Sequence, residues 1–250
     1  MKYLFCAFSF WLLSSAGLLA QGSGSADRGF QPAKGPVPRM PDGKPDLSGV
    51  WQRPYVPDMT KTARDQNGMA ELPFTEWGAN QWKNYHAEDG DYSGSCLPFG
   101  LSRAINSPEP VQIIQSATYV SFLFEQNNWH HVLPIDGRKH RDQIPTWFGD
   151  SVGHWEGDTL VVETVNFNGK TRLDTIGHPH SDQLKMTQRF TRTDLGHISY
   201  EVTIDDPKTF SKPWKNSRTF TLRPDWELME YSCEENNKSL WEGRIKVPKF

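Results

Sequence analysis

The chain has 250 residues, with 30 acidic and 27 basic side chains and a formal net charge of −3 at pH 7. Its Lys and Arg residues are dispersed rather than gathered in a stripe, so neither nucleic acid nor an anionic membrane surface is expected as a partner. Ten Trp and 14 Phe are unusual, and aromatic residues favour strands, line ligand cavities and stack on sugar rings. This composition favours a β protein that binds a small molecule; the alternative is that the aromatic residues only fill a wide β core.

The first 20 residues are predicted to form a secretory signal peptide. Lys2 gives the start a positive charge, residues 3–19 are mostly apolar, and small residues lead to an expected cleavage after Ala20. The apolar stretch is too short for a membrane span. No membrane segment is therefore expected after cleavage, and the mature protein is expected in the periplasm or outside the cell. Residues 21–44 are rich in Gly, Pro and charge and predict a flexible leader.

Two cysteines remain after the signal peptide is removed. Cys6 leaves with that peptide, and Cys96 and Cys233 stay in the mature chain. Two thiols in an oxidising compartment predict one disulfide. The alternative is two separate buried thiols. A disulfide here closes a long loop and contributes about 4–5 kcal/mol in the chain-entropy picture, as an upper value.

Residues 45–250 predict a single domain, because all-β units of this size often form one domain. The domain begins with a strand near Trp51. Residues 58–94 are the least strand-like part, and Thr75 can cap a short helix that carries Trp77 and Trp82. This helical insertion is a candidate cover for a barrel mouth. Residues 96–103 predict a turn-rich loop.

From residue 111 the pattern predicts antiparallel strands joined by short turns. The expected strands are residues 111–115, 119–125, 129–135, 151–155, 159–164, 184–192, 197–204, 218–222 and 228–233. The central hairpin turns at residues 156–158, where Gly accepts a positive φ without a steric penalty. Its second strand has two faces of nearly equal apolarity, with Leu160, Val162 and Thr164 on one of them, which is typical of a barrel wall or a central strand.

These elements predict a mainly β fold in which an antiparallel meander closes into a barrel, with a short helical insertion. Closure removes exposed strand edges, and a barrel of this strand number can hold one small ligand. A β-sandwich is the alternative, because strand spacing alone does not separate the two. No Gly-rich phosphate loop and no alternation of strands with helices points to a nucleotide-binding α/β fold.

The sequence Gly49-Val50-Trp51 resembles the Gly-x-Trp start of lipocalin-like (calycin) barrels. The resemblance implies that Trp51 plugs one end of the barrel. It also implies that an Arg of a late strand lies across this Trp as a cation–π partner. Arg244 is the candidate for that partner.

Five stretches together resemble a family of exported bacterial proteins of unknown function. They are residues 45–51, 136–140, 149–164, 179–181 and 233–236, and the likeness covers nearly all of the chain after the signal peptide. The resemblance implies export and a shared β fold but carries no activity. Members of that family often have Arg after the strand that opens near Trp129, whereas this chain has His130 and His131.

Four residues in the loops around the central hairpin are candidate catalytic residues. His140 or His180 can serve as general base or acid, because imidazole titrates near neutral pH. Asp174 can orient the histidine, and Arg138 can hold an anionic group or stabilise a developing negative charge. If these loops meet at one mouth of the barrel, the set favours a hydrolase or a lyase. Otherwise Arg138 belongs to a turn and the histidines are solvated loop residues.

Two other motifs are weaker. No metal is predicted, and a zinc site is only the less favoured alternative, because two histidines separated by one residue are common by chance. Its ligands would be His178 and His180, with Asp174, Asp182 or His140. Ser151 lies in a Gly-x-Ser-x-Gly sequence, but that nucleophile motif needs a strand–turn–helix context and the flanks here are strand-like.

The first functional hypothesis is therefore an exported barrel that binds a small apolar or sugar-like ligand in an aromatic-lined cavity. The candidate ligand-binding residues are Trp129, Trp147, Trp155 and Tyr200. The second hypothesis is a hydrolase or lyase on a small polar or carbohydrate substrate, with His140, Asp174, His180 and Arg138 at the cavity mouth. The third is a structural envelope protein with a filled barrel.

Overall fold

The computed structural model describes residues 29–87, 94–235 and 237–246. The chain divides into two compact units, residues 1–31 and residues 32–250. All the described helices and strands belong to the second unit. The predicted signal peptide, residues 1–20, lies outside the described residues. Among the helices that are described, none combines the length and the apolarity needed to cross a bilayer.

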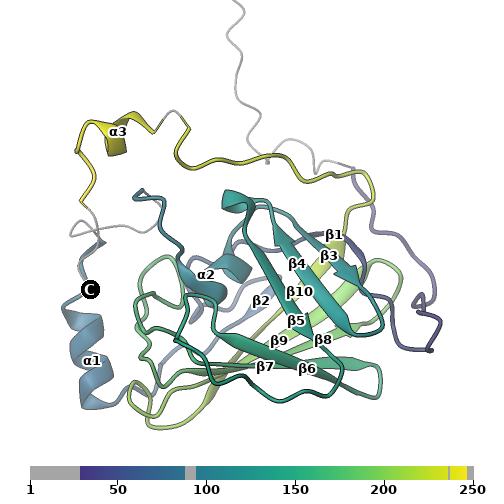
Figure 1. Cartoon of the computed structure of the whole chain (residues 1–250), viewed down its shortest axis with the longest axis horizontal. Helices are drawn as coiled ribbons and strands as arrows, with labels where there is room; N and C mark the ends of the chain where they lie inside the picture. The colour runs from purple at the N-terminus through teal and green to yellow at the C-terminus, as the bar shows by residue number, and fades with distance from the viewer. Residues whose placement is uncertain (1–28, 88–93, 236, 247–250) are drawn as a thin grey trace, which may run out of the picture. The chain divides into compact units, whose positions relative to one another are not determined.

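The described residues form ten strands, three α-helices and a short 3-10 helix (Figure 1). In chain order these are β1 (Gly49–Gln52), β2 (Gln66–Asn67), α1 (Glu76–Lys83), α2 (Gly100–Asn106), β3 (Val111–Gln115), β4 (Tyr119–Phe124), η2 (Gln126–Asn128), β5 (His130–Pro134), β6 (Asp150–Glu156), β7 (Thr159–Val165), β8 (Lys185–Arg192), β9 (His197–Asp205), β10 (Trp214–Leu222) and α3 (Lys238–Trp241).

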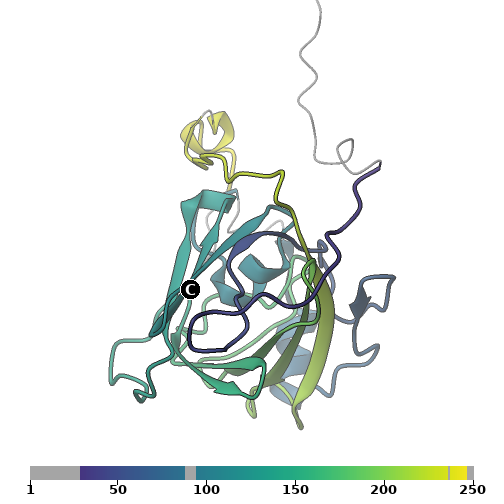
Figure 2. The ribbon, with the colours of Figure 1, turned by 90° about the vertical axis from the view of Figure 1, so that its right-hand side faces the viewer.

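Nine of the strands form one antiparallel sheet in the order β5-β4-β3-β1-β10-β9-β8-β7-β6, and β2 adds to β10. The sheet curls until its end strands β5 and β6 approach each other, and Figure 2 shows the strands surrounding α2. The result is a nearly closed barrel. The prediction of a mainly β, antiparallel barrel with short helices is confirmed, and the β-sandwich alternative is wrong.

The strands β5 and β6 meet through side chains, since no ladder joins them among the described strands. His131 Nε2 on β5 lies 2.8 Å from Ser151 Oγ on β6. Gly153 of β6 has no side chain, and a Cβ there would lie 2.8 Å from Ile135 and 3.0 Å from Leu133. The missing Cβ therefore lets these two side chains pack directly against β6. We call this junction the seam.

Trp51 of β1 belongs to the hydrophobic core of the barrel. It is fully buried, its Nε1 donates a hydrogen bond of 2.9 Å to the carbonyl of Leu47, and the Arg192 guanidinium lies 5.0 Å from the centre of its ring. Arg192 belongs to β8, so the expectation for Arg244 is wrong. Arg244 follows α3 and pairs with the exposed carboxylate of Glu242.

The central hairpin is formed by β6 and β7, and Leu160, Val162 and Thr164 are buried on one face of β7 as predicted. The predicted strand at residues 228–233 is wrong, because this stretch forms no strand. β10 extends from Trp214 to Leu222 and pairs with β9 on one side and β1 on the other. The edge that the predicted strand required is therefore already taken by β1.

The helix α2 lies where a turn-rich loop was predicted. All its residues are buried, and Leu101, Ala104 and Ile105 belong to the core at the i, i+3, i+4 spacing of one helix face. Arg53 donates a hydrogen bond of 2.5 Å to the carbonyl of Ala104, an acceptor in the last turn of the helix. It donates another of 2.5 Å to the carbonyl of Glu109, beyond the helix end. Gly100, Ser102 and Asn106 have low helix propensity, so the sequence pattern did not predict this helix.

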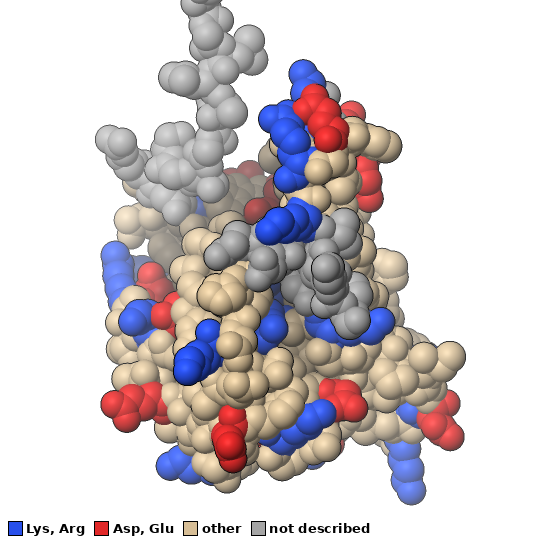
Figure 3. Space-filling model, turned by 90° about the vertical axis from the view of Figure 1, so that its left-hand side faces the viewer, with Lys and Arg blue, Asp and Glu red and all other residues tan. Residues whose placement is uncertain are grey.

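The predicted helix after Thr75 is confirmed as α1. The hydroxyl oxygen of Thr75 accepts a hydrogen bond of 3.1 Å from the amide of Gly78, which is the expected N-cap contact. Figure 3 shows the face on the α1 side of the barrel, where acidic and basic side chains are interspersed. This face therefore carries no large region of a single charge.

Part of the predicted leader, from residue 29 to residue 44, is described and makes contacts with the barrel. Arg39 makes two hydrogen bonds to Asp158, of 2.9 and 2.7 Å, at the turn of the β6–β7 hairpin. The ammonium group of Lys44 lies 6.0 Å from the ring centre of Trp155, and the amide of Leu195 donates to the carbonyl of Gly35. Gly35, Arg39 and Lys44 thus contact the hairpins β6–β7 and β8–β9 at or near their turns.

Candidate ligand-binding site

The most apolar of the described cavities has a volume of about 330 Å³. Its walls are formed by a residue just before α2, by the end of η2 and the start of β5, and by the segment before β6. The lining residues are Pro98, Asn128, Trp129, His130, Thr146, Trp147 and Phe148. We call this cavity the aromatic pocket.

Packed aromatic rings fix the wall of the aromatic pocket. The ring of Trp129 meets Phe99 edge-on at 4.4 Å and Phe148 edge-on at 5.8 Å between ring centres, an arrangement that aromatic pairs favour. Asn127 and Asn128 have positive φ values of 57° and 51°. Asn tolerates this region better than most residues. The two asparagines turn the chain between β4 and β5, immediately before Trp129.

Backbone hydrogen bonds hold the opposite wall. The amide of Thr146 donates to the carbonyl of Asn166 at 3.1 Å, and the amide of Asn168 donates back to the carbonyl of Thr146 at 2.9 Å. These bonds attach the segment that carries Trp147 and Phe148 to the end of β7. Because both walls rest on strands, the pocket is largely pre-formed, as small-molecule sites usually are.

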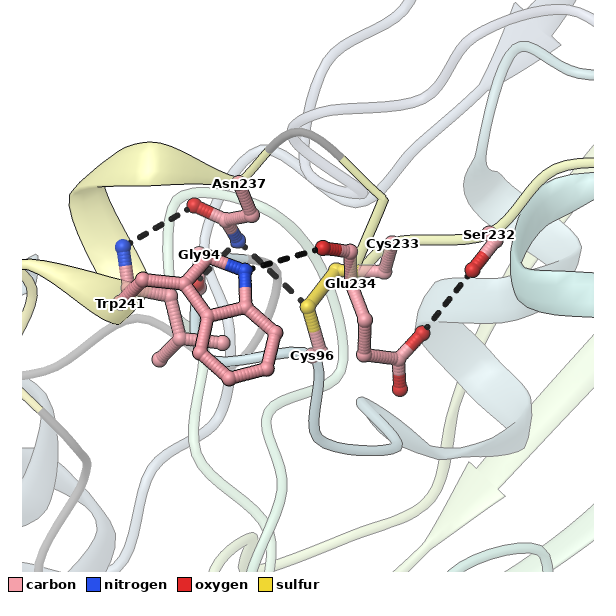
Figure 4. Close-up of a disulfide and its surroundings, with 8 residues drawn as sticks. Gly94, Cys96, Ser232, Cys233, Glu234, Asn237 and Trp241 are labelled. Atoms are coloured by element: carbon pink, nitrogen blue, oxygen red, sulfur yellow. Dashed lines mark hydrogen bonds between the residues drawn. A yellow bond between two sulfur atoms is a disulfide. The ribbon is translucent and has the colours of Figure 1, made fainter.

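The C-terminal segment passes along the rim of the aromatic pocket. Asn128 donates to the carbonyl of Tyr231 at 3.0 Å and accepts from its amide at 3.3 Å. The predicted disulfide between Cys96 and Cys233 is confirmed and lies just beyond this contact (Figure 4). Asn237 adds a hydrogen bond of 3.1 Å to the carbonyl of Gly94. The disulfide and these hydrogen bonds fasten the C-terminal segment beside the pocket.

Two of the four residues predicted to bind a ligand line this pocket, and two do not. Trp129 and Trp147 lie in its wall. Trp155 lies near the hairpin turn beside Lys44. Tyr200 is fully buried in the barrel, with Phe190 and Phe220 at 5.0 and 5.2 Å between ring centres, so it is a core residue. Phe148 and His130 were missed, although each adjoins a predicted tryptophan in the sequence.

The four predicted catalytic residues fall into separate hydrogen-bonded groups. Arg138 bonds to Asp136 and to the Tyr119 hydroxyl. His140 Nδ1 lies 3.0 Å from Asp150 Oδ2, and Asp150 also accepts from Arg141. Asp174 bonds to His178 instead, so it orients neither His140 nor His180. Asp150 is the carboxylate beside His140.

His180 has a defined tautomer. Its Nδ1 lies 2.9 Å from the carbonyl oxygen of Ser181, which can only accept, so Nδ1 carries the proton. Nε2 then accepts from the Thr171 hydroxyl at 2.7 Å. Burial lowers the pKa of His180 below its ordinary value. The residue lines a polar cavity of about 390 Å³ beside α1, but both of its ring nitrogens already have partners.

Asp58, Asp174 and His178 bring three potential metal ligands within 4.8 Å of one another. The Asp174 carboxylate already accepts hydrogen bonds from the amides of Met59, Gly177 and His178 and from His178 Nδ1, the last at 2.6 Å. A cation would compete with these four donors for the same two oxygens. The cluster thus has a complete set of contacts of its own, in which the His178 ring also stacks on Trp82.

A short polar chain crosses the seam inside the barrel. Ser151 Oγ lies 2.8 Å from His131 Nε2 and 2.7 Å from Thr164 Oγ1. Burial lowers the pKa of His131 to about 4, and the neighbouring His130 contributes in the same direction. His131 is therefore neutral at neutral pH and a weak base, and its contact with Ser151 holds β5 to β6.

Stability is expected to fall as the pH drops from 7 to 4, because His131 binds its proton in the unfolded chain near pH 6.5 but in the fold only near pH 4. The unfolded state then binds more protons, and the difference lowers the free energy of unfolding by about 3 kcal/mol at pH 4. Urea unfolding as a function of pH measures this loss. His131→Gln should remove that part of the slope and His154→Gln, an exposed histidine of β6, should not; an unchanged slope in His131→Gln would contradict the assignment.

No protein-family model matches this chain, and no curated protein is significantly similar to it. The function is therefore inferred from the geometry alone.

Proposed function

We propose that this protein is an exported binding protein that takes a small sugar-like or apolar ring in the aromatic pocket. The observation that carries the proposal is the pairing of Trp129 and Trp147 in the walls of one cavity, with Phe148 beside them. A cavity of mainly apolar character with a few polar groups is the usual form of a small-molecule site.

The lining favours a ring that has an apolar face and a polar edge. Aromatic side chains stack on the C–H face of a sugar or on another aromatic ring. Asn128, His130 and Thr146 add polar groups to the walls. A sugar ring satisfies both conditions, because its hydroxyl groups can meet the polar residues while its face meets a tryptophan.

Export is part of the proposal. It rests on the predicted signal peptide and on the disulfide between Cys96 and Cys233, because disulfides persist mainly in oxidising compartments. A periplasmic or secreted binding protein would meet its ligand outside the cytoplasm. The hydrolase or lyase alternative has less support, since its four residues lie in separate hydrogen-bonded groups.

Trp129→Ala is expected to weaken ligand binding by about tenfold or more, because truncating a buried aromatic anchor of a binding site commonly costs more than 1 kcal/mol. Isothermal titration of the mature, oxidised protein against a panel of neutral sugars and small aromatic compounds finds the ligand. The same titration then compares the variants. Trp147→Ala should show a loss of similar direction.

Trp241→Ala is the matched control. This tryptophan is 74% exposed and lies outside the pocket wall, so its loss should leave the affinity unchanged. Circular dichroism confirms that each variant is folded. A panel without any binder, or a binder whose affinity neither pocket variant changes, would contradict the proposal.

A further inference from the structure

A second cavity of about 240 Å³ lies at the seam, between the end strands of the sheet. Residues of β5 and β6 form its walls, and Tyr119 of β4 closes one side. The long connection from β5 to β6 supplies Arg138, Lys139 and Arg141. We call this cavity the seam pocket. It shares no lining residue with the aromatic pocket.

Asp150 is the one carboxylate among the lining residues of the seam pocket, and it is already paired. Asp150 is almost fully buried and accepts hydrogen bonds from the amide and the Nε of Arg141, both at 2.9 Å, and from His140 Nδ1 at 3.0 Å. Burial alone would raise the pKa of Asp150, but the bonds from Arg141 and His140 outweigh it and hold this pKa below its ordinary value. Asp150 therefore stays ionised and serves to fix Arg141.

Several hydrogen-bond donors in the seam pocket keep spare capacity. Arg138 uses Nε and Nη2 for Asp136 and Tyr119, and Arg141 uses Nε and Nη2 for Asp150. In both arginines Nη1 makes no hydrogen bond within the described part of the chain. Lys139 makes no ion pair or hydrogen bond there either.

Tyr119 adds a further donor. Its hydroxyl oxygen accepts a hydrogen bond of 2.8 Å from Arg138 Nη2, so the hydroxyl proton remains free to be donated. Together with Nη1 of Arg138 and Arg141 and with Lys139 Nζ, this makes four separate donors on residues that line one cavity. Three of them are charged, and Asp136 and Asp150 balance only two of the three charges.

We propose that the seam pocket binds a tetrahedral oxyanion, the phosphate or sulfate group of a small molecule. Four donors from separate side chains match an anion with several acceptor oxygens, and charge-assisted hydrogen bonds from Arg and Lys are the strong contacts in such sites. A small cavity suits the charged group, and the rest of the ligand extends outward from the surface.

Titration of the mature, oxidised protein with inorganic phosphate and, in parallel, inorganic sulfate tests the proposal. Sodium chloride at equal ionic strength is the reference, because a diffuse charge effect responds to chloride as well. Saturable binding of phosphate or sulfate above the chloride reference is expected. The anion that binds with the higher affinity indicates whether the ligand carries a phosphate or a sulfate group. Lys139→Gln is expected to weaken it about tenfold, the value of one charge-assisted hydrogen bond.

Lys139→Gln separates binding from folding, because Lys139 has no hydrogen bond or ion pair of its own to lose in the described structure. Arg138→Gln should weaken binding as well. Arg64→Gln is the matched control, since Arg64 is almost fully exposed and lies outside the pocket. The proposal is overturned if neither anion binds above the chloride reference, or if Lys139→Gln binds as tightly as the unmodified protein. This outcome is independent of the sugar titrations, which concern the aromatic pocket.

Discussion

Trp51→Ala is expected to lower the free energy of unfolding by about 3–5 kcal/mol, the range found when a buried Trp or Phe is replaced by Ala. The indole is fully buried in the core of the barrel. Its removal leaves a cavity and deprives the Leu47 carbonyl of a hydrogen bond. It also leaves the buried Arg192 guanidinium without the ring that covers it. Urea unfolding followed by far-ultraviolet circular dichroism measures the change.

Two comparisons make the Trp51 result specific. Trp241→Ala removes an indole that is 74% exposed and should change stability by less than about 0.5 kcal/mol. Trp51→Phe keeps an aromatic ring under Arg192 and should recover a large part of the loss. If Trp51→Ala were no less stable than Trp241→Ala, burial of Trp51 would not stabilise the barrel.

Replacement of both Cys96 and Cys233 by Ala is expected to lower the free energy of unfolding by up to about 5 kcal/mol, because the bridge closes a long loop in the unfolded chain. The two cysteines are 137 residues apart in the sequence. The disulfide also fastens the C-terminal segment whose Tyr231 bonds to Asn128 at the rim of the aromatic pocket. Weaker binding of the aromatic-pocket ligand should therefore accompany the loss of stability.

Reduction separates the disulfide from the side-chain change. The unmodified protein in dithiothreitol should match the double Ala variant, and the variant itself should not respond to dithiothreitol. Each single variant should equal the double variant, since one cysteine cannot form the bridge. Equal stability of the oxidised and reduced protein would show that the bridge does not restrain the unfolded chain.

Strands with a strong local pattern were predictable, and elements defined by their neighbours were not. The hairpin of β6 and β7 was found because a Gly turn precedes a run that is rich in β-branched residues. The expected strand at 228–233 failed because β1 pairs with the free edge of β10, and this long-range pairing leaves no local signal. The helix α2 was missed because burial, rather than helix propensity, stabilises it.

The sites divide in the same way. A sequence can supply residue types, so Trp129, Trp147, Arg138 and His140 were recognised as candidates. It could not show that Asp150, not Asp174, holds His140, since that contact depends on how the β5–β6 connection folds back onto β6. Nor could the sequence show that Tyr200 belongs to the core and Trp129 to the pocket wall, because aromatic residues occur both in cores and in ligand sites.

The sequence by itself predicted the β class, the antiparallel meander and the Trp-bearing first strand, because alternation and turn residues are local signals. It left the pairing of Cys96 with Cys233 as one of two alternatives, and the structure decided for the disulfide. The tertiary structure alone decided that Arg192 covers Trp51, that the barrel closes at the seam through His131 and Ser151, and which side chains line each pocket. These depend on contacts between residues far apart in the chain, and such contacts are set by packing rather than by sequence spacing.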